Sequence, residues 1–387
     1  MAASAERLAE GLAGLAREEL RRTRRVLDTP QGVKVAVDGA ACLNFSSNDY
    51  LGLANHPRIV EAMHAALDRY GAGTGASPLV SGHMRAHEDA ETRFAAFCGL
   101  PRALLFGSGY AANIGILTAL AGPDAEIFGD RLNHACLHDG ARLSRAAYTR
   151  YGHLDLAELA DRLARSRAAL RVVATDAVFS MDGDIAPLPE MLELCERHDA
   201  WLVVDDAHGI GVLGARGRGS LEHFALASPR IVYMATLGKA LGGYGAFACG
   251  APDTIEWLVQ RARTYIFSTA LPPTLAAAAT AAVGLLEEDP ARVGTLRERV
   301  AQFRAACAAS GIATGDSSTP IQPIVVGTAR RALDASARLA ERGFLVPAIR
   351  PPTVPRDTSR LRISLCAAHS RADVEALAAN LGAALAP

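Results

Sequence analysis

The segment Trp201-Leu-Val-Val-Asp-Asp-Ala-His208 places a run of apolar residues directly before two carboxylates and an imidazole. A short apolar run that ends at polar residues is typical of a buried strand in a parallel sheet. Asp205, Asp206 and His208 would then lie at the carboxyl end of the strand, where open α/β sheets bind their ligands. We therefore predict a functional site here. The alternative is an Asp–His pair that only stabilises a turn.

The same alternation extends along the chain on both sides of this segment. Apolar runs separated by helical patterns are predicted as further strands at Ala103–Phe106, Ala125–Phe128, Arg171–Val178, Ile231–Ala235 and Gly245–Cys249. Strands that alternate with helices imply βαβ units and a mostly parallel sheet, so the predicted fold class is α/β. Residues 3–25 and Ile59–Tyr70 are predicted as helices before this region.

The pattern changes near residue 287. A long charged helix, Ala291–Ser310, is followed by a strand at Ile321–Val326, a helix at Ala329–Arg342 and a strand at Arg362–Leu365. This order predicts a smaller α+β domain. We expect a large domain over residues 49–286, a small domain over residues 287–387, and an N-terminal segment, residues 1–48, that joins the small domain.

The composition excludes several classes of protein. Of the 387 residues, 50% are hydrophobic and 21% are charged, and the net charge is −1. This near-neutral balance argues against a nucleic-acid binder or a protein of anionic membrane surfaces. Seven scattered cysteines without a C-x-x-C motif argue against a disulfide framework and fit the cytoplasm. Two uncharged stretches, Ala103–Pro123 and Thr264–Leu286, contain glycines, prolines or threonines and are interpreted as buried elements rather than membrane spans.

A lysine follows the next predicted strand. The segment Thr236-Leu-Gly-Lys239 comes directly after Ile231–Ala235, and the neighbours of the lysine are small. Partial desolvation makes a lysine amine nucleophilic and able to form a Schiff base. A solvated surface lysine is the common alternative.

A glycine-rich turn offers a third group. Gly107-Ser-Gly-Tyr-Ala-Ala112 follows a predicted strand and opens a helix, and it matches the dinucleotide pattern G-x-G-x-x-A. A plain glycine turn and a phosphate site at a helix start are the other two interpretations. His134 and His138, four residues apart on a helix that we expect Asn133 to cap, could bind a metal, but no third ligand is evident.

One cofactor would use these motifs together. Pyridoxal phosphate needs a lysine that binds its aldehyde, a carboxylate at its ring nitrogen and a cup for its phosphate. Lys239, Asp205 and the helix start at Gly109-Tyr110 supply these three groups. A dehydrogenase would use only the glycine-rich turn.

These motifs stand in segments that resemble the α-oxoamine synthases, pyridoxal-phosphate enzymes with the aspartate aminotransferase fold, also called fold type I. The resemblance covers nearly the whole chain. Its signature segments are Asn44–Gly52, Asp130–His134, Val178–Gly183, Val204–Gly209 and Phe267–Thr269. The resemblance implies a large cofactor-binding domain and a homodimer with a shared active site.

The resemblance also implies roles for individual residues. The implied catalytic residues are Lys239, His134, Asp205 and His208. Lys239 would bind the cofactor aldehyde, His134 would stack on its ring, and Asp205 would pair with its ring nitrogen. His208 and Ser180 would lie beside its phenolic oxygen. The phosphate would be held by Gly109, Tyr110, Thr236 and, from a second subunit, Thr269.

A separate set is implied for the substrates. Arg362 would bind the carboxylate of the amino acid, and Asn48 and His134 would lie near the bound substrate. Arg21, Arg350 and Thr353 would line the channel for the acyl chain. No metal is implied.

Within the family, Ala348–Pro355 and Ser359–Ile363 look most like members that act in biotin biosynthesis. Those members condense L-alanine with pimeloyl-CoA or a pimeloyl-carrier protein and release CO₂. A sister enzyme that uses glycine or serine, an ordinary aminotransferase and a non-enzymatic regulator are the alternatives. Asp176 stands where a glutamate is common in the family, and its shorter side chain would change the contacts that this position makes to the cofactor environment. The loop Gly75–Gly82, which borders the acyl site in the family, has fewer glycines than usual, so the acyl preference is the property most open to change.

Overall fold

The computed structural model describes residues 2–386, which form two compact units. Unit 1 comprises Met1–Ser47, Met181–Gly183 and Leu296–Pro387, and unit 2 comprises Asn48–Ser180 and Asp184–Thr295. The chain therefore crosses between the units four times, twice at the short segment Met181–Gly183. Each unit is described by itself below.

A seven-stranded sheet forms the centre of unit 2, in the order β3-β9-β8-β7-β6-β4-β5. All neighbours in this sheet are parallel except β9, which is antiparallel to both β3 and β8. The mostly parallel sheet predicted from the sequence is thus confirmed. The strands are β3 (Arg102–Phe106), β4 (Ala125–Asp130), β5 (Ala147–Tyr151), β6 (Leu170–Asp176), β7 (Ala200–Asp205), β8 (Ile231–Thr236) and β9 (Ala246–Gly250).

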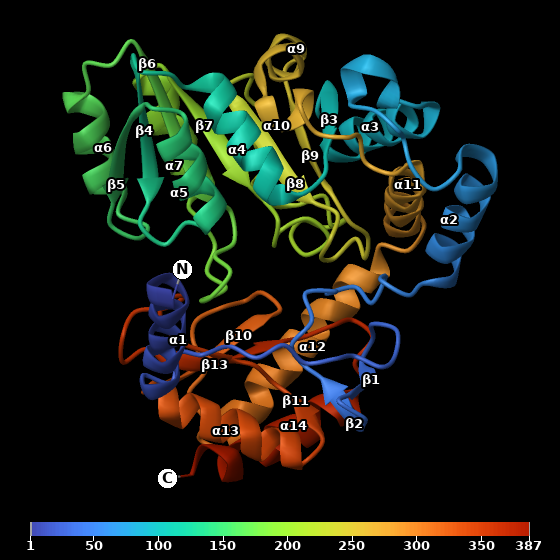
Figure 1. Cartoon of the computed structure of the whole chain (residues 1–387), viewed down its shortest axis with the longest axis vertical. Helices are drawn as coiled ribbons and strands as arrows, with labels where there is room; N and C mark the ends of the chain where they lie inside the picture. Colours follow the sequence, from blue (N-terminus) through green and yellow to red (C-terminus); the bar gives the residue numbers. More distant parts are fainter. Residues whose placement is uncertain (1, 387) are drawn as a thin grey trace. The chain divides into compact units, whose positions relative to one another are not determined.

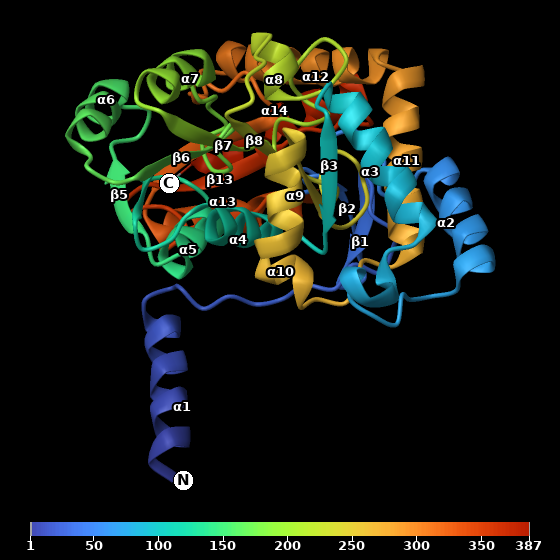
Figure 2. The same ribbon diagram turned by 90° about the horizontal axis from the view of Figure 1, so that it is seen from above.

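Helices cover both faces of this sheet, as Figure 2 shows, with α4, α5, α9 and α10 on one face and α7 and α8 on the other. The central strands are buried on both sides, which explains their continuous apolar runs. The helices of unit 2 are α2 (Pro57–Tyr70), the π-helical turn η1 (Pro78–Gly82), α3 (Arg85–Cys98), α4 (Gly109–Leu120), α5 (Ala135–Leu143), α6 (Leu156–Arg165), α7 (Leu188–Arg197), α8 (Ser220–Phe224), α9 (Pro252–Arg261), α10 (Arg263–Ile266) and α11 (Pro273–Glu288). Helix α12 (Ala291–Ala309) begins in unit 2 and continues into unit 1.

Two strand predictions need correction. β5 was not predicted, because this edge strand buries only Tyr151 completely and carries no apolar run. The strand predicted at Arg171–Val178 ends at Asp176, and Val178 instead forms an isolated bridge with Ile185. The carboxyl end of β6 therefore lies level with that of β7, where Asp176 pairs with Asp205.

The two uncharged stretches fold as the sequence predicts. Ala103–Pro123 forms most of β3 and all of α4, and Thr264–Leu286 forms most of α10 and α11. Within residues 2–386, no helix combines the length and apolar character that a membrane crossing requires.

Unit 1 contains two three-stranded sheets (Figure 1). One joins β1 (Lys34–Val37), β2 (Ala40–Asn44) and β11 (Phe344–Leu345), and the other joins β10 (Ile321–Gly327), β13 (Ser359–Ser364) and β12 (Ala348–Ile349). Helices α13 (Ala329–Glu341) and α14 (Arg371–Leu385) pack with the end of α12 around one apolar core, which includes Phe45, Phe303 and Leu361. The strands β1, β2, β11 and β12 are short and were not predicted.

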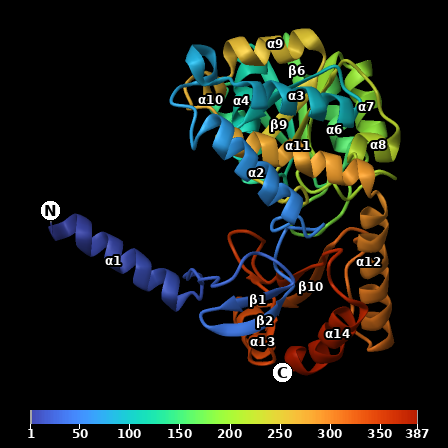
Figure 3. The same ribbon diagram turned by 90° about the vertical axis from the view of Figure 1, so that its right-hand side faces the viewer.

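The N-terminal helix is shorter than predicted. α1 (Ala2–Arg17) ends before the arginine-rich segment, not at residue 25. Glu19 adopts a positive φ of 60°, and the N–H of Leu20 donates to the carbonyl of Leu15 at 2.8 Å, which closes the helix. Arg350 donates to the freed carbonyl of Glu19. Figure 3 shows α1 projecting from the rest of unit 1.

Candidate active site

The polar residues of interest lie at the carboxyl ends of three neighbouring strands. Asp176 ends β6, Asp205 ends β7 and Thr236 ends β8. The register pairs Asp176 with Asp205, and Asp205 with Met234. The three side chains therefore share one edge of the sheet, as the strand pattern predicts.

Asp205 is buried and held in one orientation by hydrogen bonds from two directions. Its Oδ2 accepts from Nδ2 of Asn113 at 2.6 Å, and its Oδ1 accepts from the N–H of Ala207 at 2.9 Å. Asn113 is fully buried on α4, the helix that follows the glycine-rich turn. A carboxylate fixed in this way can face a cationic ring nitrogen without rotating away.

A second chain of hydrogen bonds contains the predicted lysine. Nζ of Lys239 lies 2.8 Å from Nε2 of His208, and Nδ1 of His208 lies 2.7 Å from the hydroxyl of Tyr50. That hydroxyl also donates to Oδ1 of Asn48 at 3.2 Å. Lys239 is half-buried and His208 is buried, so the amine is placed beside a proton-accepting group within a partly dry site.

His134 lies at the start of α5, where its backbone is held by β6. Its N–H donates to Oδ2 of Asp176 at 2.6 Å, and the backbone N–H of Asp176 donates to Oδ1 of Asn133 at 3.1 Å. His134, and not Asn133 as predicted, caps the helix, because its Nδ1 accepts from the N–H of Cys136 at 3.3 Å. The side chain of His134 keeps an exposed face, as a residue that stacks on a ligand requires.

The residues at the start of α4 fit a phosphate group. Ser108 caps this helix through its hydroxyl, which leaves the N–H groups of Gly109 and Tyr110 at the positive end of the helix dipole. A Cβ added to Gly109 would lie 3.9 Å from Cβ of Thr236, so the hydroxyl-bearing end of β8 borders this cup. Together with the fixed carboxylate of Asp205 and the amine of Lys239, these groups match the three needs of pyridoxal phosphate.

Three other predicted cofactor residues lie near these elements. The hydroxyl of Tyr110 donates to Oδ2 of Asp139 at 2.8 Å, and Ser180 is half-buried just beyond the bridge made by Val178. Thr269 is exposed, and the N–H of the next residue, Ala270, donates to the carbonyl of Ala76 in the loop Gly75–Gly82.

The predicted acyl-channel residues belong to unit 1, where they lie together. Nη2 of Arg22 donates to the hydroxyl of Thr353 at 3.0 Å, and Arg350 donates to the carbonyls of Glu19 and Arg21. Arg350 therefore stabilises the backbone that carries Arg21. Arg362 is buried on β13 and donates to the hydroxyl of Ser364 at 2.9 Å.

Sequence reasoning missed three residues of the site. Asn113, Tyr50 and Cys136 each contact a predicted residue directly. Asn113 follows Gly109 by one helical turn, and Tyr50 lies inside the signature segment Asn44–Gly52, so both had a positional signal. Cys136 had none, since a buried thiol in a helix is ordinarily a packing residue.

The metal alternative gains no support at His138. Nδ1 of His138 bonds to the hydroxyl of Tyr148. Among residues 2–386, the grouping of side chains that could hold a metal is His83, Glu88 and Glu91, which includes neither His134 nor His138. Nε2 of His83 already lies within hydrogen-bond distance of Oε2 of Glu88, at 3.1 Å.

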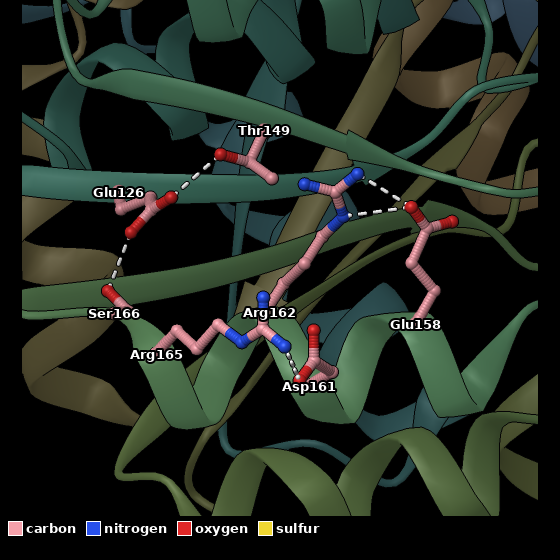
Figure 4. A pocket seen from close by; sticks show the side chains of 7 residues that line it. All are labelled: Glu126, Thr149, Glu158, Asp161, Arg162, Arg165 and Ser166. Carbon is pink, nitrogen blue, oxygen red and sulfur yellow. Dashed lines mark hydrogen bonds and ion pairs between the residues drawn. The ribbon is translucent and has the colours of Figure 1, made fainter.

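A charged cavity of about 310 Å³ lies elsewhere on unit 2 (Figure 4). Its lining residues bond to one another: Glu126 accepts from Thr149 and Ser166, and Arg162 and Arg165 pair with Glu158 and Asp161. Glu126 stands near the start of β4, away from the carboxyl ends of the strands. The cavity is therefore separate from the site described above.

Known proteins resemble this chain over nearly its whole length. Residues 40–381 match the family model "Aminotransferase class I and II". The chain is similar to the 8-amino-7-oxononanoate synthase of Methylococcus capsulatus, with 54% identity over 95% of this chain and 96% of that protein. Two further curated relatives with the same name are 57% and 50% identical to this chain.

Solved structures give the same picture. A lysine-to-alanine variant of a serine palmitoyltransferase from S. paucimobilis, with a bound aldimine of pyridoxal phosphate and myriocin, matches with a TM-score of 0.92 and 28% identity, over 97% of this chain and 96% of that chain. An 8-amino-7-oxononanoate synthase from Francisella tularensis matches with a TM-score of 0.77 and 30% identity, over 88% of this chain and 97% of that chain.

Proposed function

The chain belongs to the class I and II aminotransferase family, in the branch of the 8-amino-7-oxononanoate synthases, and we propose substrates and residue roles on that premise. It is a pyridoxal-phosphate-dependent acyltransferase of biotin biosynthesis. We propose that it condenses L-alanine with pimeloyl-CoA, or with a pimeloyl-carrier protein, and releases the thiol and CO₂. The dehydrogenase and regulator alternatives are thereby set aside.

One observation carries the proposed roles. Lys239 and His208 come from different loops at the carboxyl edge of the sheet, yet Nζ and Nε2 lie 2.8 Å apart, and Asp205 ends the strand just before His208. Such a group of titratable side chains at a strand edge is typical of a catalytic site.

Pyridoxal phosphate, when bound, supplies a cationic ring that stabilises negative charge at Cα of the amino acid. The fixed carboxylate of Asp205 would keep the ring nitrogen protonated, because an adjacent anion favours the charged form. The N–H groups of Gly109 and Tyr110, with the hydroxyl of Thr236, would bind the phosphate.

The protein groups would handle the protons and orient the substrates. Nζ of Lys239 would accept the proton from Cα of L-alanine, as a positioned base beside His208. We propose that the guanidinium of Arg362 binds the alanine carboxylate, for which its planar, two-pronged geometry is suited. Asn48, linked to His208 through Tyr50, would face the bound substrate.

We further propose a homodimer with a shared active site. Leu79, Val80 and Phe267 are strongly exposed apolar side chains, and their segments are neighbours because Ala270 bonds to Ala76. Exposed apolar groups of this kind mark interaction surfaces, and a second copy of the chain is the usual occupant. Thr269, two residues beyond Phe267, would then reach the phosphate of the partner.

The seven cysteines support a reducing, cytoplasmic location. All seven are free thiols. Proteins of oxidising compartments ordinarily pair such residues.

The substrate proposal is tested by release of the CoA thiol from pimeloyl-CoA. The holoenzyme is assayed with L-alanine, glycine or L-serine, and we expect release with L-alanine to exceed the other two by at least about tenfold. Faster release with glycine or L-serine would move the chain to a sister activity. No release with any of them would overturn the acyl substrate.

The chain offers a matched pair of control variants, because Lys34 and Lys239 are its two lysines. Lys34 is exposed at the edge of β1 in unit 1. We expect Lys34→Arg to keep full activity and Lys239→Arg to lose it, since arginine keeps the charge but forms no Schiff base. Steady turnover by Lys239→Arg would contradict the role given to Lys239.

A further inference from the structure

Helix α5 begins with an unusual cap. Ser, Thr, Asp and Asn are the common N-cap residues, but here the cap is His134, whose Nδ1 accepts the N–H of Cys136 at 3.3 Å. A ring nitrogen that accepts a hydrogen bond carries no proton. The cap therefore favours the form of His134 in which the proton is on Nε2.

The thiol of Cys136 acts on the same nitrogen. Its Sγ lies 2.8 Å from Nδ1 of His134 and 3.9 Å from Oδ2 of Asp205. Nδ2 of Asn113 donates to this sulfur at 3.0 Å, which uses a lone pair and leaves the S–H free to donate. Oδ2 of Asp205 and Nδ1 of His134 are both within reach of the S–H, and Nδ1 is the nearer, so the backbone N–H and the thiol of Cys136 both lie beside one ring nitrogen.

The backbone of His134 is fixed from the other side. Oδ2 of Asp176 accepts its N–H at 2.6 Å, while the amide of Asn133 bonds to β6 through the N–H of Asp176 and the carbonyl of Ala174. Asp176 is buried at the end of β6, so these hydrogen bonds fix the backbone of His134 to a strand inside the sheet. His134 cannot turn its ring over without breaking the cap.

We propose that Cys136 and Asp176 are positioning residues that hold His134 in the tautomer protonated at Nε2, with this N–H directed to the substrate side. Nδ1 faces Sγ of Cys136, which in turn lies 3.9 Å from Oδ2 of Asp205, and His134 as a whole is exposed, so we infer that Nε2, across the ring from Nδ1, is the nitrogen that a ligand can reach. Partial burial, opposed by Asp205 but assisted by Lys239, lowers the pKa of His134, so the ring is neutral near pH 7.

A fixed N–H donor has a use in the reaction, and here we build on the proposed function. Attack on the pimeloyl thioester places negative charge on its carbonyl oxygen. A preoriented neutral donor stabilises that charge without reorganisation. The wrong tautomer would present a lone pair to the same oxygen and repel it.

The tautomer is measured directly by ¹⁵N-histidine NMR of the holoenzyme. The chain has 11 histidines, and the His134→Asn variant identifies the signals of His134 by their loss. We expect a pyrrole-type shift for Nε2 and a pyridine-type shift for Nδ1. A pyrrole-type Nδ1 in the unaltered protein would overturn the assignment.

Four variants, two at each position, test the positioning residues. Cys136→Ala and Asp176→Ala should each bring in signal of the Nδ1–H form and lower kcat about tenfold, with the KM for L-alanine unchanged. Cys136→Ser keeps a donor at this position, and Asp176→Asn keeps an oxygen acceptor. Both variants should therefore show the same ¹⁵N pattern as the unaltered protein. An unchanged pattern in Cys136→Ala would refute the role of the thiol, even if Asp176→Ala fails to fold. Because the NMR pattern does not depend on pimeloyl-CoA, a failure of the proposed substrates is separable from a failure here.

Discussion

Asp206, next to the catalytic candidate Asp205, has a separate role as a buried carboxyl. Its Oδ2 accepts from the hydroxyl of Tyr233 and the N–H of Ser220, both at 2.7 Å, while its Oδ1 has no hydrogen-bond partner among residues 2–386. Burial raises its pKa from 3.8 to about 7, against these hydrogen bonds, and the nearby charge of Asp205 adds to the rise. The folded protein therefore keeps a proton here that the unfolded chain loses above about pH 4.

This proton makes stability fall as the pH rises from about 4 to about 7, by up to about 1.4 kcal/mol per pH unit. Asp206→Asn removes the titration and keeps an oxygen acceptor, so we expect a flatter dependence of the unfolding free energy on pH in that window. Denaturant unfolding at several pH values measures the slope. Asp89→Asn, on the exposed side of α3, is the matched control and should leave the slope unchanged. If the unfolding free energy of Asp206→Asn fell with pH as steeply as that of the unaltered protein, the buried proton on Asp206 would be refuted.

At the scale of single residues, the sequence was most informative at strand ends. Asp205, His208 and Lys239 directly follow apolar runs, and sheet topology alone places such residues at one edge. The contacts of Asn113 and Cys136 depend on which face of α4 and α5 meets that edge. A buried polar residue within a helix gives no sign in the sequence of the partner that it will find.

One imidazole joins the end of β4 to the loop after β6. Nδ1 of His153 lies 3.0 Å from Oδ1 of Asp130, and Nε2 lies 2.5 Å from Oδ2 of Asp184. Burial lowers the pKa of His153, but the hydrogen bonds and charges of the two carboxylates outweigh it and raise the pKa to about 9. His153 is therefore charged at neutral pH, between the loop that leads to His134 and the loop that follows Ser180.

A raised histidine pKa stabilises the folded protein below about pH 6.5, and this contribution is lost as the pH rises to about 9. With 22% of its side chain exposed to screening water, we expect a contribution of about 1–2 kcal/mol. At pH 6, His153→Gln should be less stable than the unaltered protein by this amount. The difference in unfolding free energy between the two proteins should vanish above pH 9. Thermal unfolding at both pH values measures it. His64→Gln, at an exposed position of α2, is the control and should change the stability at neither pH. If His153→Gln lowered the stability by the same amount at pH 6 and above pH 9, the proposed charge of His153 between the two carboxylates would be contradicted.

At the scale of elements, long periodic segments were predicted and short or marginal ones were not. The central strands and α2, α12 and α13 were expected because their apolar patterns are continuous or regular. The sequence pattern does not reveal β5, because an edge strand needs few apolar residues. It predicts too long a helix at α1, because the charged residues after Arg17 are good helix formers. The turn at Glu19 that ends α1 is bonded by Arg350, which is distant in the sequence.

The grouping of whole segments into units depends on contacts that no local pattern records. Met181–Gly183 belongs to unit 1 although its neighbours on both sides belong to unit 2. Within unit 1, Asp182 bonds to Arg360, and the carbonyl of Gly183 accepts from Ser317 at 2.9 Å. Three residues are too few to show a domain assignment in a sequence.

The proposed shared site has a consequence for the whole dimer, since Lys239 and Thr269 would serve one site from different chains. Lys239→Arg and Thr269→Glu, which places a negative charge at the phosphate, should each abolish turnover alone. A heterodimer of the two, isolated through two different tags, should recover about half of the unaltered activity, because one of its two sites receives both intact residues. A heterodimer of one Lys239→Arg chain and one Lys34→Arg chain is the positive control, and it should also show about half of the turnover of the unaltered dimer. If Thr269 served its own subunit, both sites of the mixed dimer would be damaged, and the absence of recovered activity would refute the shared site.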